Sequence, residues 1–79
     1  MTENPQIDND RIDEAVLALL WLGLHDEGRT WKGFDWQAMH RLHEKGYISD
    51  PVGKAKSVVF TEAGERESER LFHELFRKR

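Results

Sequence analysis

Hydrophobic residues recur at three- and four-residue spacing in three stretches of the chain, which predicts three helices. The first runs from about Asp10 to His25, because Asp8, Asn9 and Asp10 are all suitable N-cap residues and Gly28 is a plausible stop. Its apolar residues fall on two faces, Ile12, Val16, Leu19, Leu20 and Gly23 on one and Leu17, Trp21 and Leu24 on the other. A helix that is apolar on two sides is buried on two sides. We therefore expect it to be the central core helix, or to bury one face against a second subunit.

A second helix is predicted from the N-cap residue Asp35 to Lys45. Phe34 and Met39 have the spacing of a hydrophobic staple around that cap. Gly46 supplies the left-handed position that commonly ends a helix. The third helix is predicted to start after the cap residue Thr61 and to run from Glu62 to about Arg77. Its apolar stripe consists of Ala63, Ser68, Leu71, Phe72, Leu75 and Phe76.

Two short strands are predicted between the second and third helices. Tyr47-Ile48 and the β-branched segment Ser57-Val58-Val59-Phe60 are separated by Asp50-Pro51-Val52-Gly53, a turn sequence. We expect them to pair as a hairpin whose long basic tip is Ser49–Lys56. Residues 26–34 are predicted to be a loop in which Trp31 and Phe34 close the end of the core.

These elements define an α+β fold class, with three helices and a two-stranded β-hairpin. Residues 1–7 are predicted to be a flexible N-terminal tail, and residues 8–79 a single domain. A chain of 79 residues buries a thin core, so good packing or a partner subunit has to contribute to its stability. The chain has no cysteine, which excludes disulfides and thiolate metal sites and fits a cytoplasmic location. The longest apolar run, Ala15–Leu24, is too short to cross a membrane.

The second half of the chain carries a recognisable pattern. A helix leads into Gly46-Tyr47-Ile48, a hairpin tip follows, and Val58-Val59-Phe60-Thr61-Glu62-Ala63-Gly64 opens the last helix. Over roughly residues 36–76 this order resembles winged-helix regulators of the MarR and PadR type. The resemblance implies a reduced winged-helix arrangement whose second helix would be the recognition helix and whose hairpin would be the wing. A helix-turn-helix joins its helices through three or four residues, whereas residues 26–34 separate them here.

Over almost its whole length the chain also resembles an uncharacterised family of short bacterial proteins. The motifs that carry this resemblance are Leu24-His25-Asp26-Glu27-Gly28-Arg29, Trp31-Lys32-Gly33-Phe34-Asp35-Trp36, Leu42-His43-Glu44-Lys45-Gly46 and Ile48-Ser49-Asp50-Pro51-Val52-Gly53-Lys54-Ala55-Lys56-Ser57-Val58-Val59. The resemblance implies a domain of unknown function and assigns no activity.

Nucleic-acid binding is one hypothesis for the function. It would use Arg41 and Lys45 on the second helix and Lys54 and Lys56 on the hairpin tip. Lysines in such a tip can neutralise phosphates without reading sequence; alternatively, they keep an exposed hairpin from aggregating. The net charge of the chain is −3, whereas duplex binders usually present a clearly basic face, so duplex binding is not the favoured hypothesis.

Metal binding and catalysis have weaker support in the sequence. His40 and His43 share a helix face and could hold a metal with His25, Asp26 or Glu27, but no H-E-x-x-H spacing exists; the alternative is that imidazole rings stack on Trp36. The chain has no G-x-S-x-G elbow, and the sequence around Gly53-Lys54-Ala55 lacks a phosphate-loop pattern. We therefore predict a protein that is not an enzyme, with no cofactor and no small-molecule substrate.

Protein–protein contact is the favoured hypothesis. Aromatic residues are enriched at interface hot spots, and five of them are candidate anchors, although they could instead fill the core of a monomer: Trp21, Trp31, Trp36, Phe72 and Phe76. The first and last helices both carry wide apolar faces. The sequence therefore predicts a small interaction module that forms a homodimer through these two helices or binds another protein.

Overall fold

The computed structural model describes residues 7–25 and 28–78. The elements along the chain are α1 (Asn9–Leu20), the short 3₁₀ helix η1 (Trp21–Gly23), β1 (Arg29–Trp31), α2 (Trp36–Glu44), β2 (Ser57–Val59) and α3 (Glu62–Phe76). The two strands form an antiparallel sheet. The predicted class, an α+β domain with three helices and a two-stranded sheet, is therefore confirmed. Residues 1–6 of the predicted tail, and the loop residues Asp26 and Glu27, lie outside the described part of the chain.

Helix α1 begins one residue earlier than predicted and ends five residues earlier. Asp8 is the N-cap, and its carboxylate accepts hydrogen bonds from the backbone N–H groups of Asp10 and Arg11. At the other end, the buried hydroxyl of Thr30 donates a 2.6 Å hydrogen bond to the carbonyl of Leu20. This bond satisfies a carbonyl that the helix end would leave unpaired. The chain then tightens into η1, a turn at which the sequence pattern had predicted continued α-helix.

The other two helices lie where the pattern predicted them. Asp35 caps α2 by accepting the N–H of Ala38, and Gly46 after the helix has φ +84°. Thr61 caps α3, because its hydroxyl accepts the N–H of Gly64 at 2.9 Å. The same hydroxyl donates to the carbonyl of Gly46 at 2.6 Å, so this one residue joins the end of α2 to the start of α3.

The sheet differs from the predicted hairpin. Strand β2 pairs with β1, in the register Arg29 with Val59, Thr30 with Val58 and Trp31 with Ser57. The predicted partner segment forms one bridge, between Ile48 and Phe60, supported by a hydrogen bond from the Ser49 N–H to the Val59 carbonyl. The prediction of a loop over residues 26–34 is thus wrong for residues 29–31. Buried Thr30 anchors these residues as a strand, which no alternation in the sequence had indicated.

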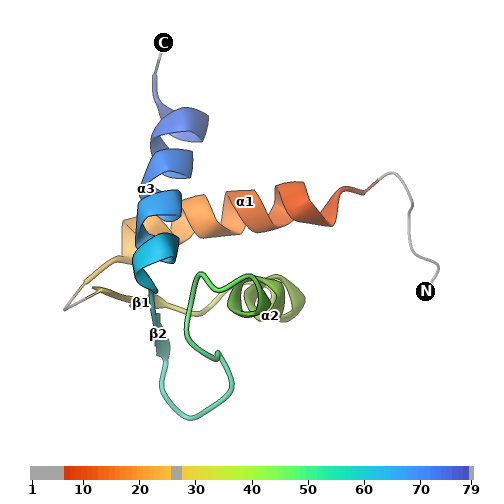
Figure 1. The fold of residues 1–79 in the computed structure, drawn as a ribbon, viewed down its shortest axis with the longest axis vertical. Coiled ribbons are helices and arrows are strands. Elements are labelled where there is room, and N and C mark those ends of the chain that lie inside the picture. The colour runs from red at the N-terminus through yellow and green to blue at the C-terminus, as the bar shows by residue number, and fades with distance from the viewer. Residues whose placement is uncertain (1–6, 26–27, 79) are drawn as a thin grey trace.

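The core lies where α1, α2 and the sheet meet beneath α3. Figure 1 shows α3 crossing α1, with its C-terminal end extending beyond α1, while α2 and the strands lie on the other side of α1. Because α1 contacts both α3 and α2, it is the central core helix that its two apolar faces predicted. The buried apolar residues are Val16, Leu17, Ala18, Leu20, Ala38, Met39, Leu42, Ile48, Val58, Phe60 and Leu71. In the part of the chain that the structure describes, no helix has the length and apolarity needed to span a bilayer.

Candidate interaction surfaces

Two of the four predicted nucleic-acid contacts lie in an ion cluster between α1 and α2. The carboxylate of Asp13 is 1% exposed, and its two oxygens accept hydrogen bonds from Arg41 Nε at 3.0 and 2.8 Å. Lys45 Nζ lies 3.0 Å from Asp13 Oδ2 and 3.2 Å from Asp10 Oδ1. A buried carboxylate needs such partners, because an unpaired buried charge is costly. Arg41 and Lys45 therefore join α2 to α1, and both remain only partly exposed.

The electrostatics of this cluster follow from its contacts. Burial alone raises the pKa of Asp13, but the hydrogen bonds and charges of Arg41 and Lys45 outweigh burial and lower the pKa of Asp13 below its ordinary value of 3.8. The hydrogen bond to Asp13 likewise raises the pKa of Arg41. Burial opposes the charge on Lys45, yet its bonds to Asp13 and Asp10 leave the pKa of Lys45 raised. All three groups are therefore charged at neutral pH.

The other two predicted contacts, Lys54 and Lys56, lie in the exposed loop that precedes β2. A third lysine holds this loop. Lys32 Nζ donates to the carbonyls of Pro51 and Gly53 at 2.7 and 3.0 Å, and its backbone N–H donates to the carbonyl of Lys56. Pro51 is buried beneath the loop. The loop is thus attached to the end of β1, and no pattern in the sequence indicated this role of Lys32.

The outer face of the two-stranded sheet carries an exposed indole. Trp31 is 55% exposed and lies on the same face as Arg29, Ser57 and Val59, as the register and the alternation of buried and exposed residues require. The ring of His25 packs against that of Trp31, with 5.2 Å between centroids. Trp31 and Phe34 therefore do not close the core as expected, because both are exposed at the surface.

The remaining aromatic candidates are divided between the core edge and the surface. Trp21 is half-buried in η1, and Phe72 is half-buried against the core. Trp36 is 52% exposed, and His40 packs against its ring in a T-shaped contact at 4.7 Å. Phe76 is 48% exposed at the end of α3, with its ring centroid 5.6 Å from that of Phe72. The predicted interface residues thus do not form one surface.

The last turn of α3 extends past the core. Gly64, Ser68 and Leu71 are its buried residues, and the hydroxyl of Ser68 donates a 2.6 Å hydrogen bond to the carbonyl of Leu17 in α1. Leu75 continues this stripe by one turn but is 44% exposed. The inward-facing stripe of α3 is therefore longer than the core that it covers.

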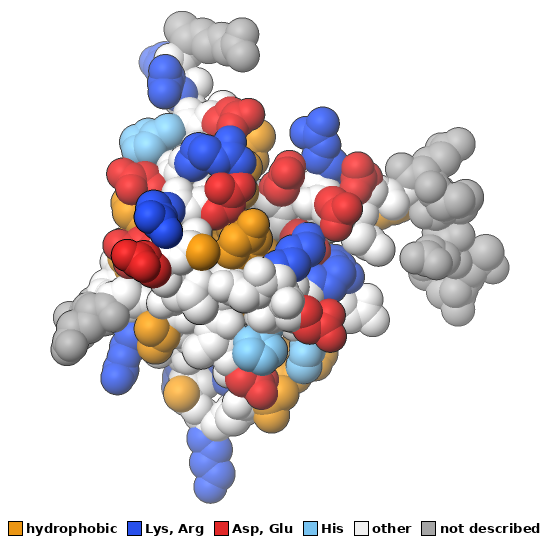
Figure 2. Space-filling view, viewed as in Figure 1, with side chains coloured by type: hydrophobic (Ala, Val, Ile, Leu, Met, Phe, Trp, Pro, Cys, Tyr) orange, Lys and Arg blue, Asp and Glu red, His pale blue; other side chains and the backbone are white. Residues whose placement is uncertain are grey.

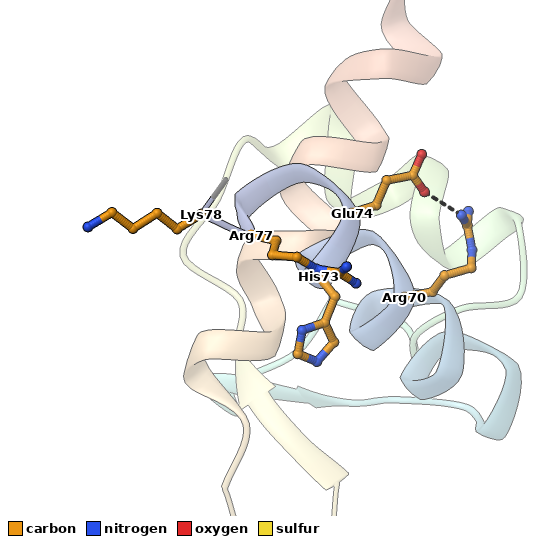
Figure 3. A pocket seen from close by; sticks show the side chains of 5 residues that line it. All are labelled: Arg70, His73, Glu74, Arg77 and Lys78. Atoms are coloured by element: carbon orange, nitrogen blue, oxygen red, sulfur yellow. Dashed lines mark hydrogen bonds and ion pairs between the residues drawn. The ribbon is translucent and has the colours of Figure 1, made fainter.

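The opposite side of α3 is charged. A surface hollow of about 590 Å³ is lined by three residues of α3 and two that directly follow it, namely Arg70, His73, Glu74, Arg77 and Lys78 (Figure 3). Arg70 forms ion pairs with Glu67 and Glu74. None of these five lining residues comes from another helix or strand. A smaller groove of about 340 Å³ lies between α1 and α3, and it is lined by Asp10, Glu14, Leu17, Lys45, Tyr47, Glu67 and Leu71.

The histidines considered as metal ligands have other contacts. His43 Nδ1 lies 3.0 Å from the carbonyl of Ile48, and His25 Nδ1 lies 2.7 Å from that of Gly23. His40 stacks on Trp36, as the alternative interpretation proposed. Residues 7–25 and 28–78 contain no group of three His, Asp or Glu side chains placed to hold a metal ion. Asp26 and Glu27, the other suggested ligands, lie outside the described residues.

Charge is distributed unevenly over the molecule. In the face shown in Figure 2, acidic and basic side chains are interspersed over α1 and α3, and lysine and arginine side chains also project from the lower end, where the sheet and its loop lie. Residues 28–36 and 49–60 carry four bases, Arg29, Lys32, Lys54 and Lys56, against Asp35 and Asp50. Both of these carboxylates accept backbone hydrogen bonds, from Ala38 and Val52. The sheet end is therefore basic within an acidic chain.

The fold and these surfaces define a small α+β domain that presents exposed aromatic residues on the sheet, at the start of α2 and at the end of α3. The chain belongs to the DUF6429 family, described as a domain of unknown function, whose pattern matches residues 8–78. It is 62% identical over 71 residues to the uncharacterised protein y4hR of Sinorhizobium fredii, an alignment that covers 90% of this chain and 96% of that protein. No solved structure matches the chain. The resemblance to a family of unknown function is thus confirmed, and the comparisons assign no activity.

Sequence reasoning missed three buried polar residues that position these surfaces. From the sequence, Asp13 falls within the first predicted helix, Thr30 within a predicted loop and Ser68 within an apolar stripe, and none of them is predicted to make a buried hydrogen bond. Each makes a hydrogen bond to another element. The burial of Asp13 could have been inferred from its position in the helix. It lies three residues before Val16 and four before Leu17, so its side chain falls on the same face as these core residues.

Proposed function

We propose that the domain is a protein-interaction module that pairs with a second copy of itself through the C-terminal half of α3. The observation that carries this proposal is the exposure of Leu75 and Phe76 on the last turn of α3, which extends past α1. Phe72 adds a half-buried ring beside Phe76. An exposed aromatic ring on an otherwise charged helix is a typical anchor of an interface.

The charge pattern of α3 supports one orientation of the pair. Residues 62–69 contain four glutamates and one arginine, whereas residues 70–78 contain three bases and one glutamate. Two α3 helices that cross in antiparallel orientation near Phe72 bring the basic end of each copy beside the acidic start of the other. A two-fold pair of this kind uses the same patch on both copies, as isologous dimers do. A parallel pair would instead place like charges together.

The direct test compares the mass of the wild-type chain with that of variants over a range of concentrations. We expect the wild type to approach the dimer mass as concentration rises in multi-angle light scattering. The double variant Leu75→Ala/Phe76→Ala should remain monomeric, because it removes both exposed anchors. Val52→Ala is the matched control, since Val52 is also exposed but lies in the loop before β2. A wild type that stays monomeric at every concentration, or a double variant that dimerises equally well, would contradict the proposal.

A second candidate function is that of a winged-helix nucleic-acid-binding regulator. The exposed position of Lys54 and Lys56 favours it, and the order of helices and strands is compatible with a reduced winged helix. The engagement of Arg41 and Lys45 by Asp13 counts against it, because binding of phosphate by these cations would compete with a buried ion pair.

An amide NMR titration with a mixed-sequence duplex separates this candidate from the module. Shifts over residues 39–45 and 49–56 that fade with salt would support a regulator, because phosphate contacts release counterions. The charge-reversal variant Lys54→Glu/Lys56→Glu should abolish those shifts. An absence of shifts at low salt would exclude duplex binding.

A further inference from the structure

The outer face of the sheet combines an exposed ring with a cation and lacks acidic residues. Its four residues are Arg29, Trp31, Ser57 and Val59. None of them contributes to the core, whereas the alternate residues Thr30 and Val58 are buried. Trp31 and Val59 are both exposed on this face, and an exposed apolar patch that is bordered by polar residues is typical of an interaction site.

The order of groups along this face is informative. Arg29 and Trp31 are two residues apart on one strand, so their side chains leave the same face about 7 Å apart. Beyond the Trp31–Ser57 pair lies the loop that carries Lys54 and Lys56. The indole is therefore placed between a guanidinium on one side and a lysine-bearing loop on the other. His25 packs against the indole and limits the positions that the ring can adopt.

The loop is held in place beside this face. Lys32 Nζ donates to the carbonyls of Pro51 and Gly53, which attaches the start of the loop to the end of β1. Asp50, the acidic residue of the loop, accepts the N–H of Val52 at 2.9 Å. Lys54 and Lys56 thus belong to a loop whose start is held by contacts within the chain.

We propose that this face binds single-stranded nucleic acid, with one base stacked on Trp31 and the flanking phosphates beside Arg29 and the lysines of the loop. Base stacking on an aromatic ring combined with a basic track is the usual chemistry of single-strand binding, and it needs no sequence readout. The net positive charge of the sheet end, in a chain of net charge −3, provides the charge complementarity. A duplex would not offer its bases to the indole, because they are stacked within the helix.

An acidic peptide could use the same cations, but the indole favours the nucleic acid. A carboxylate would occupy Arg29 without covering the adjacent ring, whereas a nucleotide presents an anion and a flat aromatic surface together. The affinity for a nucleic acid should therefore depend on Trp31, whereas the affinity for an acidic peptide should not. Substitution of Trp31 distinguishes the two ligands.

The experiment measures fluorescence anisotropy of a labelled oligothymidylate with the full chain at low and moderate salt. We expect binding that weakens as salt rises and that falls roughly 5- to 100-fold in Trp31→Ala, the range for one lost stacked base. Trp31→Phe should retain part of the affinity, since it keeps a ring. Trp36→Ala is the matched control, because Trp36 is equally exposed but packs on His40 in α2. Arg29→Ala should weaken binding and reduce its dependence on salt by about one phosphate contact.

Three outcomes would overturn the proposal. One is the absence of binding at low salt. Another is binding that Trp31→Ala and Trp36→Ala weaken equally, provided that circular dichroism shows both variants to be folded. The third is displacement of the oligonucleotide by polyglutamate as effectively as by unlabelled oligothymidylate, which would assign the face to acidic polymers in general. None of these outcomes depends on whether the chain dimerises through α3.

Discussion

At the residue scale, the fold depends on the absence of a side chain at Gly64 and on the buried carboxylate of Asp13. A Cβ atom added at Gly64 would lie 1.8 Å from the carbonyl oxygen of Tyr47, so the first turn of α3 rests directly on that backbone. The resemblance to winged-helix sequences included this glycine within its Thr-x-x-Gly segment. Its physical reason, a close approach between two backbones, could not be inferred without the fold.

We expect Gly64→Ala to lower the free energy of unfolding by at least about 2 kcal/mol, because neither backbone can move aside cheaply. Gly33→Ala is the matched control, since no atom lies within 4 Å of its added Cβ. That substitution should be neutral or slightly stabilising, because it restricts the unfolded chain. Urea unfolding followed by circular dichroism measures both. Equal stability of the two variants would contradict the close approach at Gly64.

Asp13 should dominate the acid sensitivity of the fold. Its pKa is lower in the folded chain than the ordinary value of 3.8, so the unfolded chain binds more protons in this range. The stabilisation is therefore fully present well above the unfolded pKa of 3.8 and is lost as pH falls through the folded pKa. We expect Asp13→Asn to cost about 2 kcal/mol at neutral pH, less than a fully buried pair, because Arg41 and Lys45 are partly exposed.

The check is urea unfolding of the wild type and of Asp13→Asn at neutral and acid pH. The difference in stability between the two should shrink as pH falls below about 4. Asp10→Asn is the control, because Asp10 also contacts Lys45 but its side chain is 82% exposed. An Asp10→Asn variant as unstable as Asp13→Asn would show that burial of the carboxylate is not the cause.

At the element scale, the helices could be predicted and the strand pairing could not. Helical periodicity and cap residues fix α2 and α3 from local sequence, since a cap bonds to residues two or three positions away. The pairing of β1 with β2 joins residues about 28 positions apart, which no local pattern encodes. The prediction of where α1 ends was wrong for the same reason, because the hydroxyl that bonds to the carbonyl of Leu20 belongs to Thr30, ten residues later.

The N-cap residue Thr61 joins the start of α3 to the end of α2. Thr61→Ala removes both the bond to the Gly64 N–H and the bond to the Gly46 carbonyl. We expect a loss of about 1 kcal/mol in the free energy of unfolding, the usual effect of removing such a cap. Thr61→Ser keeps the hydroxyl and should retain most of the stability. If Ser and Ala were equally destabilising, the methyl group and not the hydroxyl would be the stabilising part of Thr61.

At the scale of the whole molecule, the candidate surfaces are those that the core leaves uncovered. Leu75 and Phe76 lie on the part of α3 that extends beyond its contacts with α1. Trp31 lies on the sheet face that points away from the core. The sequence indicated that its aromatic residues exceed the needs of a small core. It could not assign them to separate surfaces, because that assignment depends on where α3 crosses α1 and on the register of the sheet.

The antiparallel pairing of α3 is tested most directly by two charge-swapped chains, Arg77→Glu/Lys78→Glu and Glu65→Lys/Glu69→Lys. In each variant alone, the start and the end of α3 carry charge of the same sign, so two copies should repel each other. In a mixture, both contacts between α3 helices of unlike chains join opposite charges and are attractive. We expect sedimentation velocity to give monomers for each chain alone and a heterodimer for the equimolar mixture. A mixture that sediments as the average of its two components, or variants that each dimerise as the wild type does, would contradict the pairing of copies through α3.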